Sequence, residues 1–444
     1  MADKELFSDL SVQHSPRALD AGRARLREPV RDQIELRSVD LDALLGADHP
    51  ARLIWDYVSR IDLQVLEQKV RAREHTPGQA PASPRLLLAL WLYATSEGVG
   101  SARALARLCD NHDAYRWLCG GVSVNYHGLA DFRTAEPELL DRLLSEHVAT
   151  LSAAGVISLD EITQDGVRVR ASAGAASFRR SKTLHKELKK AQRRVKALRL
   201  ELHDDPDASN RRIQAAQQRA AREREAKVKA ALDRLAQIEA ERARRGRTNK
   251  NQTAKQKEPR ASTTDPQARV MKMADGGYRP AHNCQLATVA DGQIVVAVDV
   301  DGTGSDHGLM RPMIEQIERR HGRRPKRYLV DGGFNKNDDT EWAAAQGVAV
   351  YGPPVRSKHD SDPYAPRRDD GPGVAAWRRR MKSPHGKSVY KRRTVGECIN
   401  ARVRQWGFRQ FVVRGHDKVR ALLGLFALAN NILQGHRLSQ SAAA

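Results

Sequence analysis

Three acidic residues, Asp165, Asp331 and Glu397, occupy positions from which carboxylates can bind divalent metal ions. Asp331 ends the apolar run YLV and precedes two glycines, so a predicted buried strand opens into a turn there. Ligand sites gather where strands of an open sheet end in this way. Asp165 lies on or beside another predicted strand. Both aspartates also fit ordinary Asp-Gly turns, and Asp160 and Glu161 are rivals of Asp165 for the same role.

Glu397 belongs to a repeating pattern of polar residues. Tyr390, Arg393, Glu397 and Arg404 are spaced 3, 4 and 7 residues apart, which places all four on one face of a helix. Such a stripe would set a carboxylate among cations that bind phosphates. A solvent-exposed stripe of ion pairs, which is common on surface helices, would show the same spacing.

Phosphodiester cleavage is the chemistry that these carboxylates suit. Two Mg²⁺ ions about 4 Å apart can activate the nucleophile, stabilise the developing charge and neutralise the leaving oxygen, and carboxylates are their natural ligands. We therefore expect two Mg²⁺ ions, which Mn²⁺ can replace. Further phosphate contacts are expected from Arg378, Arg379 and Arg380, within a long Pro- and Gly-rich loop at residues 353–389.

The composition indicates a polyanionic partner. The formal net charge is +22 and the pI is about 10.1, and so large a charge repels itself unless nucleic acid neutralises it. Aromatic residues make up only 5% of the chain, which favours phosphate contacts on double-stranded DNA over stacking of unpaired bases. A merely soluble basic protein is the alternative.

The cysteines and the apolar segments exclude several other classes. The four cysteines have no C-x-x-C spacing, so neither a zinc knuckle nor a redox pair is predicted. The N-terminus has no apolar stretch typical of a signal peptide. The longest apolar runs, 86–94 and 421–429, are too short to span a membrane. We expect a soluble protein of the bacterial cytoplasm, associated with the nucleoid, with no membrane partner.

The N-terminal third is predicted to be helical. Residues 1–35 read as a flexible arm, and helix-spaced apolar positions recur through residues 36–150. The helix at Pro84–Ser96 has Ser83 as its expected N-cap. The short helices expected near residues 102–118 are typical of helix-turn-helix DNA-binding domains, but also of small helical bundles.

A basic segment interrupts the following domain. Residues 179–260 contain 26 Lys or Arg against 11 Asp or Glu, a difference of +15. They are predicted to form an antiparallel helical hairpin that contacts DNA or a second copy of the chain, although a solvated pair of charged helices is the simpler alternative. Its apolar heptad seam could be filled within the hairpin or between two chains. The seam comprises Leu184, Leu188, Ala191, Val195, Leu198 and Leu202. Residues 246–264 are expected to be flexible.

The remaining elements predict a mixed sheet flanked by helices. The expected strands lie at 156–162, 167–171, 278–289, 293–300, 327–330, 348–351 and 410–413. The expected helices lie at 308–320, 338–346, 394–406 and 418–433. Residues 290–292 provide a hairpin turn between two of these strands.

Several of these segments resemble one family. The run YKRRTVGECINARVR resembles the Y-R-E-K signature of DDE transposases from bacterial insertion sequences, of the IS-four and IS-five supergroup. DGVRVRASAG and YLVDGGF resemble the first and second aspartate motifs of that family. Residues 101–133 resemble its N-terminal helical domain, and FVVRGHDKVRALLGLFALANNI its closing helix. The resemblance covers about residues 35–175 and 265–435.

The resemblance implies a fold and a division into domains. The fold would be an α/β RNase H-like catalytic core, a mixed five-stranded sheet flanked by helices, with an α-helical N-terminal domain and the inserted basic hairpin. The core would comprise residues 151–178 and 261–436, the DNA-binding domain residues 36–150, and the insertion residues 179–260. Residues 437–444 would be a tail.

The resemblance also implies residue roles. Asp165, Asp331 and Glu397 match the catalytic, metal-binding carboxylates, and Tyr390, Arg393 and Arg404 match the DNA-binding residues of the signature. Arg404 stands where Lys is usual, and an Arg offers a planar fork where Lys offers a point charge. Val167 stands where the family often has Thr.

The expected activity is transposition. The enzyme would cleave the ends of an insertion sequence and join them to target DNA, acting as a homodimer. Two alternatives remain at this stage: a non-catalytic or domesticated DNA-binding protein, and a structure-specific nuclease of the same fold that cuts but never joins strands.

Overall fold

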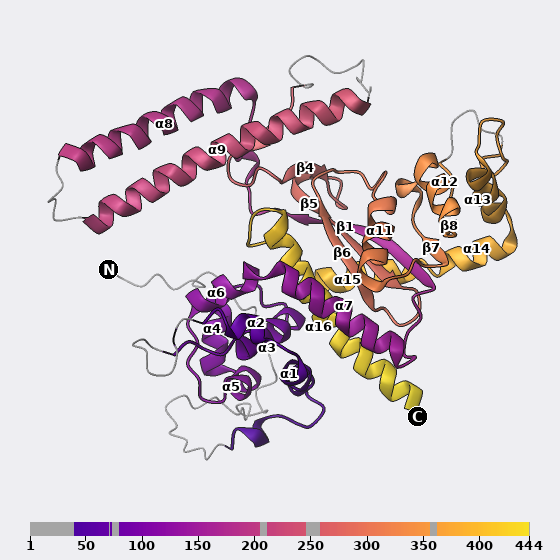
Figure 1. The fold of residues 1–444 in the computed structure, drawn as a ribbon, viewed down its shortest axis with the longest axis horizontal. Helices are drawn as coiled ribbons and strands as arrows, with labels where there is room; N and C mark the ends of the chain where they lie inside the picture. The colour runs from indigo at the N-terminus through magenta and orange to yellow at the C-terminus, as the bar shows by residue number, and fades with distance from the viewer. Residues whose placement is uncertain are drawn as a thin grey trace, which may run out of the picture. The chain divides into compact units, whose positions relative to one another are not determined.

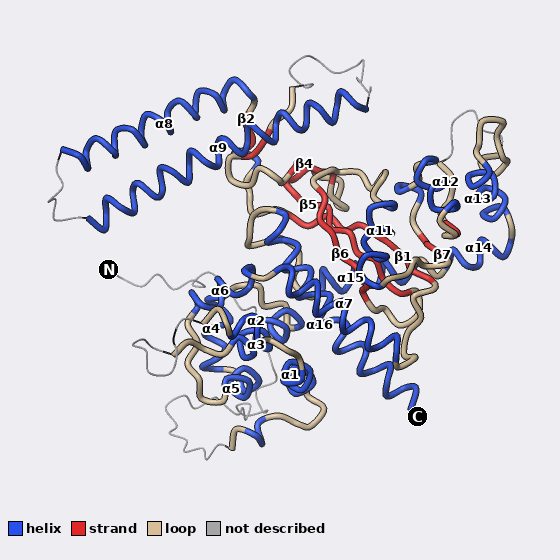
Figure 2. The backbone as a smooth tube through the Cα atoms, viewed as in Figure 1, coloured by secondary structure: helices blue, strands red, loops and turns tan. Residues whose placement is uncertain are grey.

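The structure is a computed structural model that describes residues 40–70, 72, 80–204, 211–245, 258–355 and 362–443. From Leu41 onward the chain forms one unit. The expected arm at 1–35 lies outside the described residues. Figures 1 and 2 show a group of N-terminal helices, a mixed sheet with its own helices, and a helical hairpin.

The N-terminal helices follow the apolar spacing of the sequence. Ser83 begins α3 as predicted, because its hydroxyl accepts a hydrogen bond from the Arg85 amide at 3.2 Å. The α3 helix is buried along most of its length, consistent with its run of Leu and Ala. The elements are η1 (Asp42–Leu44), α1 (Pro50–Arg60), α2 (Gln64–Glu67), α3 (Pro84–Ser96), α4 (Ala102–Asn111), α5 (Asp113–Cys119), α6 (Tyr126–Ala135) and α7 (Pro137–Ala153).

The closing helix α16 (His416–Ala443) joins these helices to the sheet. It packs against α3 and α7 and against strand β6 (Val295–Asp301), and Figure 1 shows α7 and α16 side by side. The buried Asn431 amide bonds both the N–H and the C=O of Val295, at 2.8 and 2.7 Å. The helix continues to Ala443, through the residues from 437 onward that were predicted to be a tail.

The sheet has six strands, one more than predicted. The added strand is β4, which pairs with the first part of β5, whereas β6 pairs with the later part of the same strand. The strand order is otherwise β6-β5-β1-β7-β8. Strands β1, β5 and β6 are antiparallel neighbours, and β7 and β8 run parallel to β1. The bounds are β1 (Glu161–Arg170), β4 (Arg269–Lys272), β5 (Tyr278–Val289), β7 (Arg327–Leu329) and β8 (Ala349–Tyr351).

Two strand predictions differ from the structure. Residues 156–160 form a turn and a short loop, because the chain must reverse from α7 into β1. Residues 410–413 form a single parallel bridge, Gln410 to Arg170, before the chain enters α16. The Asp165-Gly166 pair lies inside β1 instead of forming a turn, because pairing with β5 continues through both residues.

The segment 353–389, predicted to be a loop, contains two helices. These are α13 (Pro372–Lys382) and α14 (Pro384–Lys391). Proline favours the first turn of a helix, and α13 then buries the helix-spaced Val374, Trp377 and Met381. The other helices around the sheet are α11 (Met310–His321), η3 (Gly332–Phe334), α12 (Asn337–Ala345) and α15 (Thr394–Gln405).

The basic insertion forms the predicted hairpin of two helices, α8 (Ser181–Asp204) and α9 (Arg211–Arg245). Two short strands flank the hairpin: β2 (Phe178–Arg179) precedes α8, and β3 (Ala261–Ser262) follows α9. They pair with each other in a two-stranded sheet. Of the segment expected to be flexible, 246–257 lies outside the described residues, whereas 261–262 pair in β3. Within the part of the chain that the structure describes, no helix is long and apolar enough to cross a membrane.

Candidate active site

The register of the sheet places Asp165 and Asp331 at the same height. In the parallel pair of β1 and β7, Thr163 lies opposite Leu329, and the two aspartates follow two residues later on each strand. Strand β7 has ended at this point, so the sheet opens beside β1. Both aspartates line one open cleft with a volume of about 520 Å³.

Each aspartate uses one carboxylate oxygen to hold the local backbone. Oδ1 of Asp165 accepts a hydrogen bond from the Gly166 amide at 2.8 Å, and Oδ1 of Asp331 accepts one from the Gly333 amide at 2.6 Å. Asp331 thereby caps η3. The turn-forming role weighed for Asp331 is therefore real, and it leaves the second oxygen of the carboxylate for another ligand.

Glu397 reaches this region because α15 packs closely against β1. Gly396 makes that approach possible: a methyl group at this position would lie 3.1 Å from Cβ of Asp165 and 3.2 Å from Oγ1 of Thr163. The Arg393 guanidinium donates to Oε1 of Glu397 and lies 3.7 Å from Oδ2 of Asp165. Arg393 therefore connects two of the three predicted carboxylates, although the Glu397 side chain remains 56% exposed.

The Tyr390 to Arg404 stripe is not one continuous helix. Tyr390 belongs to α14, Arg393 lies between the helices, and Glu397 and Arg404 belong to α15. The residues still gather, because the turn stacks the Arg393 guanidinium 5.8 Å from the centre of the Tyr390 ring. Arg404 is exposed and lines the cleft with Asp165 and Asp331.

A third aspartate, Asp306, also lines the cleft. Its Oδ1 accepts hydrogen bonds from Asn283 at 2.8 Å and Gln285 at 2.7 Å. Gly166 leaves room for it, because a methyl group there would lie 2.6 Å from Oδ1 of Asp306. Asp306 was not among the predicted site residues, because it follows β6 in a loop of Gly, Ser and Thr that shows no regular spacing.

Electrostatics set Asp165 apart from an ordinary surface carboxylate. Burial raises its pKa from 3.8 to about 6; the Gly166 amide and Arg393 oppose this shift, and the charges of Asp331 and Asp306 add to it. Three carboxylates thus repel one another in a partly buried cleft. A divalent cation would relieve this repulsion, since an opposite charge nearby favours the ionised form.

The two rivals of Asp165 lie away from the cleft and are ion-paired. Asp160 pairs with Arg323 and, at 2.8 Å, with Lys326. Glu161 is buried and pairs with Arg327 and Arg392. Their carboxylates neutralise cations of the fold, so Asp165 is the acidic residue of β1 that faces the cleft.

Two families match the chain. The family described as "Transposase DDE domain" matches residues 247–432, and the family described as "Transposase domain (DUF772)" matches residues 39–135. Together they take in the N-terminal helices and most of the sheet with its helices. The chain belongs to the DDE transposases. No curated protein and no solved structure gives a significant match to it.

A DDE transposase is a DNA-binding enzyme that cuts and joins DNA with the help of divalent metal ions, so the activity class expected from the sequence is confirmed. The match to the DDE domain includes Asp306, Asp331 and Glu397 but begins after Asp165. Asp165 lies outside this match, so its assignment to the active site depends on its place in β1 and in the cleft.

Five arginines surround the carboxylates of the transposase cleft. Strand β1 supplies two of them, because Val167 and Val169 are buried and the alternate residues Arg168 and Arg170 line the cleft. The alternation VRVR in the sequence was the available signal for these two residues. The five are Arg168, Arg170, Arg279, Arg404 and Arg409.

Two of the three arginines expected to contact DNA from residues 378–380 hold the transposase fold instead. Arg378 is buried and pairs with Asp370 at 2.7 Å. Arg380 donates to the Val350 carbonyl at 2.9 Å and stacks on Tyr351. Both residues have partners within the fold because their segment is a packed helix, and their contact with DNA stays a prediction. Arg379 is exposed, so its side chain is accessible for the predicted contact with a DNA phosphate.

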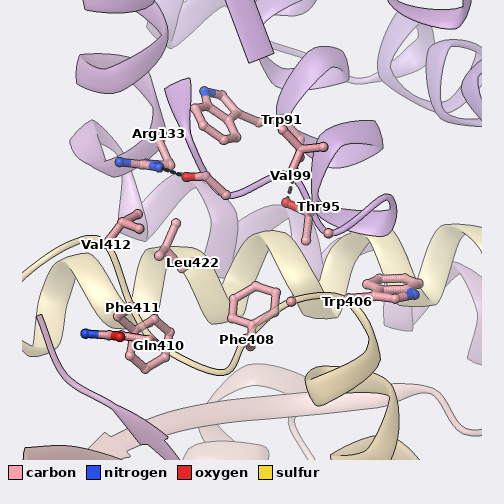
Figure 3. Close-up of a pocket in the computed structure, with 13 residues that line it drawn as sticks. Trp91, Thr95, Val99, Arg133, Trp406, Phe408, Gln410, Phe411, Val412 and Leu422 are labelled. Carbon is pink, nitrogen blue, oxygen red and sulfur yellow. Dashed lines mark hydrogen bonds between the residues drawn. The ribbon is translucent and has the colours of Figure 1, made fainter. Parts of the chain in front are cut away.

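A second cavity in the transposase is small and apolar (Figure 3). It has a volume of about 50 Å³ and lies between residues of the N-terminal helices, such as Trp91, and residues after α15, such as Phe411. Arg133 donates to the Gly100 carbonyl at its rim. Phe408 lines both this cavity and the cleft, so the two share one side chain as part of their walls.

Proposed function

We propose that Asp165, Asp331 and Glu397 are the catalytic carboxylates of this transposase and that they bind two Mg²⁺ ions, which Mn²⁺ can replace. The observation that carries the proposal is that Asp165 and Asp331 lie at the same height along the adjacent β1 and β7 segments and line one cleft. Arg393 adds Glu397 to the pair, because it contacts both Glu397 and Asp165.

The residues present fit hard divalent cations. Carboxylate oxygens are the ligands that Mg²⁺ prefers, and the partly buried, mutually repelling aspartates favour a cation in the cleft. Among the described residues, no three His, Cys, Asp or Glu side chains stand close enough together to hold a metal ion as they are. The Arg393 guanidinium lies between Asp165 and Glu397, where its positive charge partly neutralises the two carboxylates.

Each group of residues has a distinct role in the proposed reaction. Bound divalent ions supply an activated nucleophile and neutralise the charge that develops at the phosphate. Asp165, Asp331 and Glu397 would fix those ions. Arg404, which makes no ion pair in the described part of the chain, would bind a DNA phosphate in the cleft. Tyr390 and Arg393 would position the DNA next to Glu397.

We also propose an RNase H-like core and membership of the Y-R-E-K group. The order β6-β5-β1-β7-β8, with three antiparallel strands followed by two parallel ones, supports the core. The contacts among Tyr390, Arg393 and Glu397 support the signature, with Arg404 in the position where Lys is usual.

The remaining proposals concern assembly and location. Residues 36–150 would bind the element ends, the core would comprise 151–178 and 261–436, and two copies of the chain would act on the two ends as a homodimer. The net charge of +22 supports association with the nucleoid. Arg379, which is exposed, would add a phosphate contact.

An assay with labelled element ends, Mg²⁺ and a target plasmid tests the proposal. The wild-type chain should produce both cleaved ends and joined products, whereas Asp331→Ala and Glu397→Ala should bind the ends and leave them intact. Full cleavage by either variant would overturn the assignment. Cleavage without any joined product would indicate a nuclease instead of a transposase.

A further inference from the structure

The first helix of the insertion, α8, carries an excess of positive charge on its surface. Between residues 181 and 200 the only acidic residue is Glu187. Every Lys and Arg of this stretch is exposed: Lys182, Lys186, Lys189, Lys190, Arg193, Arg194, Lys196 and Arg199. The stretch contains no Phe, Tyr or Trp, so it offers charge without aromatic rings for stacking on bases.

Five of these cations form a stripe along α8. They are Lys182, Lys186, Lys189, Arg193 and Lys196, and we call them the α8 stripe. Each lies two residues before a position of the apolar seam, and an offset of two residues is about 200° around a helix. The stripe therefore lies on the face opposite the seam and extends over about 21 Å of helix.

The apolar seam is filled within the hairpin. On α8, Leu184, Ala191, Val195 and Leu198 are buried, and on α9, Val228, Ala231, Leu235 and Ile238 are buried. In the described part of the hairpin, Leu200 is the one large apolar side chain that is exposed. Over its described side chains, the hairpin therefore leaves no apolar face for pairing with a second copy, which argues against the dimer contact considered from the sequence.

The two helices differ in how their cations are neutralised. On α9, Lys227 and Lys229 pair with Glu223 and Glu225, and Arg224 pairs with Glu187 of α8. In contrast, no residue of the α8 stripe makes an ion pair in the described part of the chain. Like charges three and four residues apart on a helix repel one another, so the stripe gains from a polyanion that lies along it.

We propose that the α8 stripe binds the phosphate backbone of double-stranded DNA. The inference rests on the proposed function, because it assumes that the chain handles DNA, and it assigns to the insertion a contact outside the cleft. Lys and Arg side chains that contact phosphates, with no neighbouring residues to contact base edges, give binding that depends on the salt concentration and not on the DNA sequence. The stripe should therefore bind DNA flanking the element ends regardless of its sequence.

The base of the hairpin is fixed to the strand that borders the cleft. Glu241 of α9 accepts hydrogen bonds from Arg234 at 3.1 Å and from Arg269 of β4 at 3.2 Å. Residues directly after β4, Met273 to Asp275, line the cleft. DNA bound to α8 and DNA in the cleft would thus be held by directly connected elements.

Two matched triple variants of the full-length chain test the inference. Lys186→Gln, Lys189→Gln and Arg193→Gln remove three stripe cations, whereas Arg224→Gln, Lys227→Gln and Lys229→Gln remove three paired cations from α9. Both change the net charge equally. The measurement is the Kd for a labelled duplex without element ends, by fluorescence anisotropy, with EDTA present and at several KCl concentrations.

The stripe variant should reduce the slope of log Kd against log[KCl] by about 2.7, since each lost phosphate contact on B-DNA contributes about 0.9. The α9 variant should reduce the slope by less than about 0.9, the value for one phosphate contact. Circular dichroism should show unchanged helix content in both variants, because all six side chains lie on the surface of the hairpin.

Equal slopes for the two variants would overturn the inference and would show that only net charge matters. A stripe variant that keeps the wild-type slope but changes the molar mass in light scattering would overturn it in favour of a chain-to-chain contact. Failure of the proposed function looks different: the wild-type chain would then bind no duplex, or would bind the labelled element ends and cut none of them in Mg²⁺. A normal wild-type cleavage rate with equal slopes rejects the stripe alone.

Discussion

The two ends of the short parallel pair of strands treat acidic residues in opposite ways. At the end where β1 and β7 begin, Asp160 and Glu161 are each paired with two cations; we call this the paired end. In the cleft, Asp165, Asp306 and Asp331 lie together. Arg393 lies 3.7 Å from Asp165 and Arg168 lies 4.0 Å from Asp306, and both distances are longer than those at the paired end.

We propose that the difference separates carboxylates that serve the fold from carboxylates that serve the reaction. At the paired end, cations from neighbouring elements neutralise both acids. In the cleft, burial and mutual repulsion raise the pKa of Asp165 to about 6, which means that the ionised state is held at a cost in folding free energy. The negative charge that the nearby arginines leave unneutralised is what a divalent cation would bind.

The largest expected effect separates two aspartates that lie five residues apart. Asp165→Ala should lower the rate of end cleavage by at least about 1,000-fold, because it removes a proposed metal ligand. Asp160→Ala should leave that rate within about twofold, since it breaks only a surface ion pair. Single-turnover cleavage of labelled ends checks both variants. Similar losses in the two would erase the distinction between the cleft and the paired end.

The pH dependence of cleavage should follow the cleft alone. Metal ligands must be deprotonated, and Asp165 has a raised pKa of about 6. At a Mg²⁺ concentration that does not saturate the site, the rate should therefore be constant above about pH 6 and fall by up to about tenfold per pH unit below it. The lowered pKa of Asp160, caused by Lys326 and Arg323, keeps that residue ionised throughout this range, so Asp160→Asn should show the same profile. Arg393→Gln should move the midpoint upward, because Arg393 lowers the pKa of Asp165. A midpoint that stays fixed in Arg393→Gln would count against this arrangement.

Stability should change in opposite directions at the two ends. At pH 7 Asp165 is ionised although burial favours its protonated form, so Asp165→Asn should raise the free energy of unfolding by about 1–3 kcal/mol. The gain should disappear below about pH 4, where the aspartate is protonated in both the folded and the unfolded chain. Glu161→Gln should lower the free energy of unfolding by about 1–3 kcal/mol, because two arginines lose a buried partner. Urea denaturation at pH 7 and pH 4 checks both signs.

The smallest effect concerns the cations. Arg404→Lys keeps a positive charge in the cleft and should change the cleavage rate by less than about threefold, whereas Arg404→Ala should lower it about tenfold. At the paired end, Arg327→Ala should lower stability and leave the cleavage rate at low temperature unchanged. A cleavage defect in Arg327→Ala with unchanged stability would show that the paired end takes part in the reaction.

The sequence predicted most of the elements that carry a regular apolar spacing. Helix α3 and strand β5 have the predicted bounds, and the seam of α8 marked the hairpin. The sequence-based prediction was wrong at α13, which was predicted to be a loop. Pro, Gly and Arg dominate the composition there, and only Val374, Trp377 and Met381 indicate a buried helix face. Local composition indicates flexibility there, whereas packing against the rest of the fold decides the structure.

For the site, the sequence identified residues that lie in motifs and missed those that meet only in space. Asp331 and Glu397 stand in recognisable patterns, and the rivalry between Asp160 and Asp165 required the ion pairs of the structure to be decided. Asp306 reaches the cleft through a loop and through the absence of a side chain at Gly166. No spacing rule along the chain connects residues 166 and 306.

Binding of Mn²⁺ to the full-length chain, measured by isothermal titration calorimetry at pH 7.5, tests the central claim most directly. The comparison uses the wild type, the cleft variant Asp165→Asn with Asp331→Asn, and the paired-end variant Asp160→Asn with Glu161→Gln. The wild type and the paired-end variant should bind Mn²⁺ alike, and the cleft variant should lose this binding. Equal binding of Mn²⁺ by the cleft variant and the wild type would contradict the central claim.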